Sequence, residues 1–176
     1  YKDDTLLNRQ PKKSRKIFVC LDEQRGQYLV DGLVAMDFPL SSGVKAYPTK
    51  TGDYAVISKK EDHTSNLYGK MYDAEGKCIN YNAESTDPVP EGGRFDGSPM
   101  PYWQRLTNAG LGLHVGKVRR HPVSHGCVRL PRNVAEILYR QTSIGTPVTI
   151  QKTPLPVSEA QKIPPAQQQE SEGRKQ

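Results

Sequence analysis

Hydrophobic and polar positions alternate along the first third of the chain, after a polar start. Residues 1–15 are charged and show no periodic pattern, which predicts a basic N-terminal arm that is disordered or loosely attached. From Lys16 onward, apolar positions favour short strands separated by turns, with Asp31-Gly32 marking a tight hairpin. The expected strands cover residues 16–21, 27–30 and 33–40. The sequence therefore predicts that the domain opens as a β-meander.

The middle of the chain carries a weaker pattern. Residues 43–53 are rich in Gly, Pro, Thr and Lys and predict a loop, followed by a strand over residues 54–58. Residues 59–99 contain polar clusters and short apolar pieces divided by glycine and proline. A stretch of this length inside a domain is more often a functional excursion than an unstructured gap. We expect it to overhang the functional site, although its role cannot be read from the pattern.

The last third contains one convincing helix, from Pro131 to Gln141. Asn133 followed by Glu136 resembles a capping box, and the residues between them begin an apolar stripe at helical spacing. Gly145 can end the helical segment, and residues 147–150 predict a closing strand. Residues 151–176 are rich in Pro and Gln and predict a disordered tail. The pattern thus predicts a mainly β domain over residues 16–150 with one short helix.

Reactive side chains are concentrated between residues 113 and 130. This segment holds three of the four histidines and one of the three cysteines. Cys127 can act as a nucleophile only as a thiolate, so its neighbours determine its reactivity. Gly126 permits a sharp turn, which could bring the main-chain N–H groups of residues 126 and 127 together as an oxyanion hole. The sequence therefore predicts cysteine-based acyl transfer.

His114 is the best candidate for the base. Leu113 and its apolar neighbours alternate with glycine and His114, so on a strand the histidine faces away from the core. His125 is the rival, because it lies two residues from Cys127 and could donate to the intermediate or hold the turn. Arg129 would share a face with Cys127 on an extended chain, where its charge could lower the thiol pKa or hold a substrate carboxylate.

Ser124-His125-Gly126-Cys127-Val128-Arg129-Leu130, with His114 upstream, resembles the signature of the L,D-transpeptidase (YkuD-type) catalytic domain. Residues 47–54 resemble the family's TPTGxF turn, and residues 100–103 resemble its MPY segment. The resemblance covers about residues 16–150. The short spacer between His114 and Ser124, together with Arg129, is similar to a subgroup whose motif reads SHGC-[VI]-R-L.

The resemblance implies a β-sandwich whose one short helix follows the catalytic cysteine, and an enzyme that acts on peptidoglycan tetrapeptide stems. Cys127 would attack the bond between the L-centre and D-Ala, with His114 as base, and form a thioester that an amine of another stem resolves. Arg129 would grip a stem carboxylate, and Ser124 would order the turn or a histidine. Tyr102 and Trp103 would wall the substrate cleft, with core packing as an equal alternative.

The acceptor stays open, because the sequence does not choose among an amine, water, a free D-amino acid and a protein lysine. Water would make the chain an L,D-carboxypeptidase, a D-amino acid an exchange enzyme, and a protein lysine an anchoring enzyme. The resemblance also implies a cell-envelope location and covalent inhibition by carbapenem β-lactams. We expect a monomer that needs no cofactor.

The charge composition limits the kinds of binding partner that the chain is expected to have. The 176 residues carry a formal net charge of +6, and residues 1–16 contain six basic and two acidic residues. The rest is nearly balanced, which does not favour nucleic-acid binding, whereas the basic start could touch an anionic wall polymer or membrane surface or simply be solvated. The chain begins at Tyr1 and has no apolar run of eighteen residues, so no signal peptide or membrane span is expected within it.

Two other interpretations compete with the enzyme. Zinc could bind through His114, His121, His125 and Cys127, but the spacing is unlike a finger or ribbon and nearby arginines would oppose a dication. We therefore predict no metal. A non-catalytic wall-binding module is the second alternative. A P-loop is excluded, because no Gly-Lys pair has the required glycine upstream or a Ser or Thr after it.

The remaining cysteines and histidine have structural interpretations. Cys20 and Cys78 could pair or stay as buried thiols, and His63 is expected at the surface.

Overall fold

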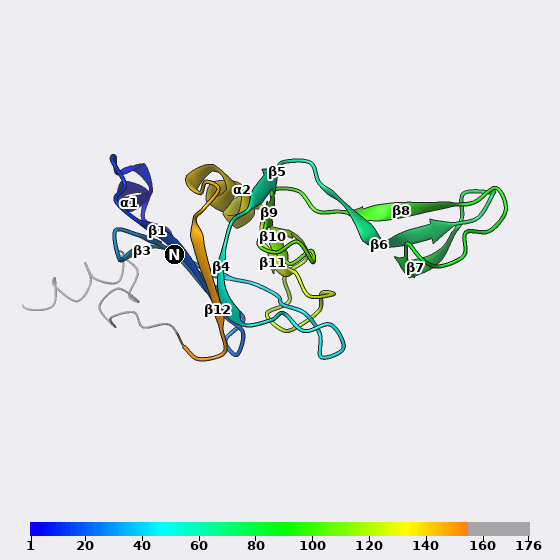
Figure 1. Ribbon diagram of the computed structural model, residues 1–176, viewed down its shortest axis with the longest axis horizontal. Coiled ribbons are helices and arrows are strands. Elements are labelled where there is room, and N and C mark those ends of the chain that lie inside the picture. The colour runs from blue at the N-terminus through cyan, green and yellow to red at the C-terminus, as the bar shows by residue number, and fades with distance from the viewer. Residues whose placement is uncertain (155–176) are drawn as a thin grey trace, which may run out of the picture.

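A computed structural model describes residues 1–154, which form two packed sheets and a third sheet that projects from one side (Figure 1). The first sheet has the strand order β3-β2-β1-β12-β4. Its strands are β1 (Arg15–Cys20), β2 (Arg25–Val30), β3 (Leu33–Pro39), β4 (Gly52–Ala55) and β12 (Pro147–Gln151). β1 and β12 pair in parallel, and the other neighbours pair antiparallel.

The second sheet carries the segment rich in histidine and cysteine. Its strand order is β11-β10-β9-β5, and the parallel pair is β10 with β11. The strands are β5 (Ser58–Lys60), β9 (Trp103–Arg105), β10 (Gly112–Val115) and β11 (Val128–Leu130). Side chains of both sheets and of helix α2 (Arg132–Gln141) meet in one hydrophobic core. The predicted mainly β fold is confirmed, with a short helix directly after β11.

The start of α2 differs from the prediction. The N-cap residue is Pro131, whose side chain cannot make a capping hydrogen bond, and the Ala135 N–H already donates to the Pro131 carbonyl at 2.9 Å. Asn133 therefore lies inside the first turn, and the expected capping box is wrong. The apolar stripe is confirmed in its first part, since Val134 and Leu138 are buried in the core.

The expectation of a loosely attached N-terminus is wrong. Helix α1 (Asp4–Asn8) begins at Asp3, whose carboxylate accepts the Leu6 N–H at 3.0 Å. Leu6 and Leu7 are both buried in the core, and the Asp3 N–H donates to the Ala35 carbonyl of β3 at 2.8 Å. Two apolar residues in a polar run are thus enough to anchor the segment. The predicted C-terminal tail falls almost wholly on residues 155–176, which lie outside the described residues.

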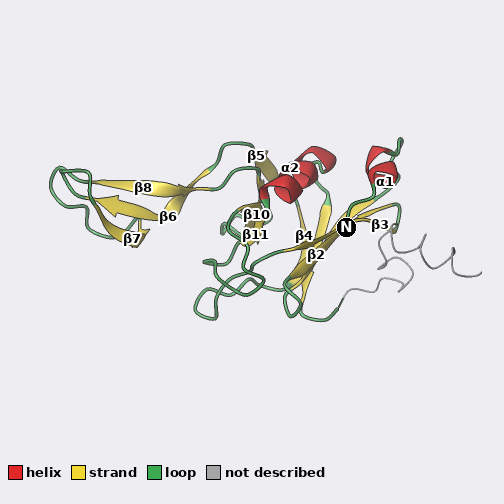
Figure 2. Ribbon diagram, turned by 180° about the vertical axis from the view of Figure 1, so that it is seen from behind, coloured by secondary structure: helices red, strands yellow, loops and turns green. Residues whose placement is uncertain are grey.

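Residues 64–99 form the projecting sheet, an ordered three-stranded unit with the order β7-β6-β8. Its strands are β6 (Thr64–Tyr72), β7 (Cys78–Glu84) and β8 (Arg94–Pro99). Figures 1 and 2 show from opposite sides that this sheet extends away from the two packed sheets. The polar composition reflects this exposure and not a loop, because a thin sheet with two solvated faces needs few apolar residues.

The base of the projecting sheet contains a wide bulge. The pairing of β6 with β8 passes from Thr64↔Pro99 to Gly69↔Gly97, so residues 65–68 of β6 face a single residue of β8. A Cβ at Gly69 would lie 2.0 Å from the Asp96 carbonyl oxygen, and one at Gly97 would lie 1.9 Å from the Ser65 carbonyl oxygen. The two strands approach this closely only because both positions are glycine.

The cysteines do not pair, since Cys20, Cys78 and Cys127 are all free. Cys20 is buried, as expected of an inert thiol, whereas Cys78 is only half-buried in the projecting sheet. In residues 1–154 no helix has the length and apolar character needed to cross a membrane.

The first prediction concerns α1. Leu7→Ala removes a side chain that is only 4% exposed, so it should lower the free energy of unfolding by about 2–3 kcal/mol. Chemical denaturation measures this loss. Thr5→Ala, at an exposed position of the same helix, serves as the control and should change stability little. Equal stability of the two variants would show that α1 does not pack on the sheet.

Candidate active site

The parallel pairing of β10 with β11 brings the two candidate catalytic residues to one face of the sheet. Leu113 pairs with Val128 and both are buried in the core, while His114 pairs with Arg129. Because side chains alternate along each strand, His114 and Arg129 point to the opposite face, and so does Cys127 immediately before β11. The residues predicted from the sequence as nucleophile and base are therefore neighbours on one surface.

That surface forms part of a cavity of about 810 Å³, which lies between the second sheet and the base of the projecting sheet. The predicted site residues that line it are His114, Ser124, His125, Gly126, Cys127, Arg129 and Trp103. The bulge of β6 contributes residues 65–68 to its wall. The expectation that the middle segment overhangs the site is confirmed in this form.

Cys127 carries a protonated thiol. Its Sγ–H donates to the Gly110 carbonyl at 3.3 Å. Burial raises the pKa of Cys127 above its ordinary value of 9.0, and this outweighs a backbone hydrogen bond from Gly112 and the charges of Arg129 and Arg105, which lower it. The sulfur therefore needs a base before it can attack.

His114 has the protonation state that such a base requires. Its side chain is buried, with 7% exposed, and burial lowers its pKa to about 4, while the hydrogen bond to Val115 opposes this shift. Nδ1 lies 2.7 Å from the Val115 carbonyl oxygen, and because a carbonyl can only accept, Nδ1 carries the proton. Nε2 is consequently unprotonated at neutral pH and free to accept a proton.

The turn before Cys127 is held by two hydroxyl groups. Ser124 Oγ donates to the Cys127 carbonyl at 2.5 Å and accepts the Gly126 N–H at 3.2 Å. Thr49 Oγ1 donates to the Gly126 carbonyl at 2.6 Å, which ties the turn to the loop before β4. Gly126 has φ +117°, a conformation that glycine adopts without strain. Ser124 thus orders the turn, and the Gly126 N–H is directed into the turn itself.

Arg129 is a half-buried cation without an acidic partner. Among the described residues, no carboxylate lies within salt-bridge distance of its guanidinium, and burial lowers its pKa. Its aliphatic part lies over Gly116, where an added Cβ would come within 2.7 Å of the Arg129 side chain. The guanidinium lines the cavity and can accept an anionic group.

Tyr102 and Trp103 do not share a role. Tyr102 directly precedes β9, and its ring packs against the core, 5.5 Å from that of Tyr139 on α2, instead of lining the cavity. The prediction that it walls the cleft is therefore wrong. Trp103 does line the cavity, with its ring 6.0 Å from His114 and packed against Gly112.

His125 contacts the projecting sheet. Its ring stacks on Tyr68 at 4.4 Å with 19° between the planes, and Tyr47 leans on it at 4.9 Å. These rings connect three segments: the loop before β4, the bulge of β6 and the turn before Cys127. His125 is exposed and engaged in this stack, and this position suits a residue that holds the turn before Cys127 in place.

The sequence reasoning missed His63 and Tyr68. His63 lines the cavity instead of lying on an open surface, and its ring stacks on Trp103 at 4.9 Å. Tyr68 reaches His125 only because of the bulge, which no local pattern predicts. In the part of the chain that the structure describes, no three His, Cys, Asp or Glu side chains group as metal ligands, and His121 is exposed in the β10–β11 connection, outside the cavity lining. The absence of a metal stays a prediction.

Comparison with known proteins gives one family. Residues 14–150 match the model of the YkuD L,D-transpeptidase catalytic domain. The probable L,D-transpeptidase 3 of Mycobacterium tuberculosis is 32% identical over 121 residues, which cover 65% of this chain and 38% of the relative. The chain therefore spans well under half of that curated relative.

Solved structures share the fold. An L,D-transpeptidase from Mycobacterium smegmatis has a TM-score of 0.60 at 22% identity. The matched region covers 78% of this chain and 58% of the M. smegmatis chain. L,D-transpeptidase 3 from M. tuberculosis has a TM-score of 0.60 at 24% identity, with 78% and 61% covered. An Enterococcus faecium L,D-transpeptidase has a TM-score of 0.55 at 27% identity, with 79% and 50% covered.

The second prediction follows from where the proton resides. With the pKa of Cys127 raised and that of His114 at about 4, the resting pair is a neutral thiol beside a neutral imidazole. Alkylation of Cys127 by iodoacetamide should therefore keep rising with pH beyond 9, because the thiolate fraction still grows there. Peptide mass spectrometry resolves Cys127 from the half-buried Cys78, which serves as the internal reference. A plateau between about pH 5 and 7 would indicate a thiolate–imidazolium pair and contradict this account.

The third prediction concerns the stack on His125. Tyr68→Ala removes an aromatic contact worth about 1 kcal/mol, so opening of the turn over residues 124–127 should become about fivefold more frequent. Hydrogen–deuterium exchange of that peptide measures the change. Tyr68→Phe keeps the ring and should exchange as the unmodified protein does. Equal exchange in both variants would mean that Tyr68 does not support the turn.

Proposed function

Because the chain belongs to the L,D-transpeptidase (YkuD) catalytic-domain family, we propose that it transfers the acyl group of a peptidoglycan tetrapeptide stem through a thioester on Cys127. The observation that carries the proposal is the placement of Cys127 and His114 on one face of the β10–β11 pair, in one cavity. A nucleophile and an unprotonated base on adjacent strands form the minimum apparatus for covalent acyl transfer.

In the first half-reaction, His114 Nε2 takes the thiol proton while Cys127 Sγ attacks the carbonyl between the L-centre and D-Ala. The C–S bond forms and the carbonyl oxygen becomes an oxyanion. When the intermediate collapses, the C–N bond breaks and the imidazolium gives its proton to the departing D-Ala amine. The products are a thioester on Cys127, neutral His114 and free D-Ala.

The oxyanion requires donors near the sulfur. The main-chain N–H of Cys127 is the donor we assign, since it lies on the turn that Ser124 and Thr49 hold. The Gly126 N–H was predicted for the same role, but it donates to Ser124 Oγ at 3.2 Å. The Gly126 N–H would have to break this hydrogen bond before it could donate to the oxyanion. It would therefore serve the oxyanion only when a substrate is bound.

The charge of the cavity fits an anionic stem. Lys50, Arg105 and Arg129 line it, and none of its described lining residues is Asp or Glu. Arg129 is the nearest of these to the reaction, because it pairs with His114 across the sheet. We assign it to a carboxylate of the donor stem, which would replace the solvation that burial removes from the guanidinium.

The acceptor completes the proposal. A side-chain amine of a diamino acid on another stem would attack the thioester and form a cross-link. Water would give L,D-carboxypeptidase activity, and a D-amino acid or a protein lysine would give exchange or anchoring. All four outcomes share the acyl-enzyme, whereas a non-catalytic wall-binding module would not form it.

Covalent inhibition by a carbapenem is part of the same proposal. Among the similar structures, one L,D-transpeptidase is in complex with imipenem, and M. tuberculosis L,D-transpeptidase 3 carries a faropenem-derived adduct. In this chain the strained β-lactam carbonyl would meet Cys127 in place of the stem. We also infer that the domain works as a monomer in the cell envelope, where its substrate is found.

The fourth prediction tests the chemistry. With purified tetrapeptide muropeptide, the unmodified protein should release D-Ala, and His114→Gln should slow that release by roughly 100-fold or more because it removes the base. Cys127→Ala should release none. Mass spectrometry of the peptide products measures both and also identifies the acceptor.

His121→Gln is the matched control, because His121 is exposed and lies outside the cavity. It should release D-Ala at the unmodified rate. Release of D-Ala by Cys127→Ala at that same rate would exclude the thioester mechanism and leave the wall-binding module as the better explanation.

A further inference from the structure

Four side chains lie in a row across the second sheet and into the base of the projecting sheet. Arg129 on β11 pairs with His114 on β10, and the antiparallel register of β10 with β9 places Trp103 beside His114. His63 then stacks on Trp103 at 4.9 Å. Since β11 and β9 are two strand spacings apart, about 10 Å, Arg129 and the Trp103 ring that carries His63 lie on either side of His114.

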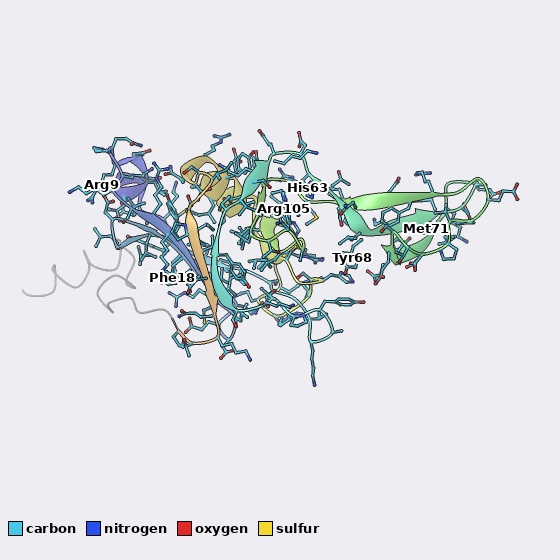
Figure 3. The ribbon with its side chains drawn as sticks, in the orientation of Figure 1. Arg9, Phe18, His63, Tyr68, Met71 and Arg105 are labelled. Carbon is cyan, nitrogen blue, oxygen red and sulfur yellow. The ribbon has the colours of Figure 1, made fainter. Side chains whose placement is uncertain are left out.

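The backbone fixes the position of His63. Its carbonyl accepts the Met100 N–H at 2.7 Å, and the Glu61 carbonyl accepts the Tyr102 N–H at 2.7 Å, so both chains entering the projecting sheet are paired at this point. Figure 3 shows His63 where the body of the domain meets that sheet. The residue is thus held at a junction and does not sit on a free loop.

The ring of His63 has one occupied face and free edges. Trp103 covers the face with 23° between the ring planes, and in residues 1–154 neither ring nitrogen has a hydrogen-bond partner. Burial is the main reason that the pKa of His63 is lowered, with smaller contributions from the charges of Lys60 and Arg105. The imidazole is therefore neutral at pH 7 and presents an unprotonated nitrogen as an acceptor.

Among the lining residues, the hydroxyl closest to His63 along the chain is already engaged as an acceptor. Ser65 Oγ already accepts the N–H groups of Leu67 and Tyr68 at 3.2 and 3.0 Å. No described lining residue is acidic, and Lys50, Arg105 and Arg129 make the walls cationic. An ammonium group would be repelled here, whereas a neutral amine can enter and donate its N–H to His63.

We propose that His63 is the acceptor-binding residue, which holds the incoming amine by a hydrogen bond and so favours transfer over hydrolysis. The inference rests on the proposed function and adds the second substrate to it. Arg129 holds the donor stem on one side of His114, the thioester lies between, and His63 orients the amine on the other side. This division follows the row of side chains across the sheet.

In the second half-reaction the amine nitrogen attacks the thioester carbonyl, so a C–N bond forms and the C–S bond breaks. The proton lost by the nitrogen passes through His114 Nε2 to the departing sulfur, which restores the thiol. His63 keeps its hydrogen bond to the nitrogen and neither gains nor loses a proton. When water is the acceptor, its small size and abundance make this orientation dispensable.

The test compares two rates of the same acyl-enzyme. The protein is incubated with tetrapeptide stem and a tripeptide stem bearing a free diaminopimelate amine, and cross-linked and hydrolysed products are quantified by mass spectrometry. His63→Phe keeps a ring for the Trp103 stack but removes both nitrogens. His63→Gln restores a hydrogen-bond acceptor without the ring, and His121→Phe is the matched control at an exposed histidine.

For His63→Phe we expect an unchanged rate of D-Ala release in the first turnover, a ratio of cross-linking to hydrolysis lowered about tenfold, and a higher amine concentration for half-maximal transfer. His63→Gln should recover part of the ratio, and His121→Phe should keep all of it. An unchanged ratio in His63→Phe, or an equal fall of first-turnover D-Ala release and cross-linking, would overturn the assignment and leave His63 a packing residue. Absence of D-Ala release by the unmodified protein would instead refute the proposed function.

Discussion

The site depends on the register of one parallel strand pair. Leu113 opposite Val128 puts two apolar side chains into the core and, by alternation, turns His114, Arg129 and the approach to Cys127 toward the cavity. A slip of one residue would reverse every one of these directions. The burial of the two apolar residues therefore fixes the chemistry indirectly, because the free energy of the core determines which face the reactive groups occupy.

The surroundings of the pair keep the cysteine in its protonated form. The cavity removes water from both the thiol and the imidazole, so each favours its neutral form. The nearby arginines lower the pKa of Cys127 without offsetting burial, and the charge of Arg129 also lowers the pKa of His114. Arg129 is kept half-buried without an acidic partner among the described residues, which costs stability. Such an arrangement is explained most simply by a ligand that supplies the missing anion and by a reaction that moves a proton only when the carbonyl is in place.

The local pattern of the sequence was informative where structure is local. Strands β1, β2, β3 and β12, the helix after β11 and the cluster around Cys127 could be predicted, because alternation and a short motif carry them. The strand expected over residues 54–58 is wrong in its bounds, since β4 ends at Ala55 and β5 begins at Ser58. The projecting sheet could not, since its strands bury little and its glycines serve close approach instead of turns. Tyr102 was misplaced because only one of two adjacent residues in an extended segment can face the cavity, and that residue is Trp103. Helix α1 was missed because two leucines give no period.

His63 and Tyr68 were missed for a different reason. Both lie in a segment remote from the motif along the chain, and they reach the cavity only through the pairing of residues 61–64 with residues 99–102 and through the bulge of β6. No spacing rule connects them to Cys127. The wall of the cavity opposite the motif is therefore a property of the tertiary structure, and there the sequence offered only the expectation of an overhang.

The central claim is that His114 is a neutral base whose proton resides on Nδ1 and whose Nε2 is unprotonated in the cavity that Cys127 also lines. Nitrogen-15 NMR of the histidine side chains, followed through a pH titration, measures this directly. We predict a protonated Nδ1 and an unprotonated Nε2 at pH 7, with a pKa of about 4 for His114. An imidazolium at pH 7, or a proton on Nε2, would contradict the account.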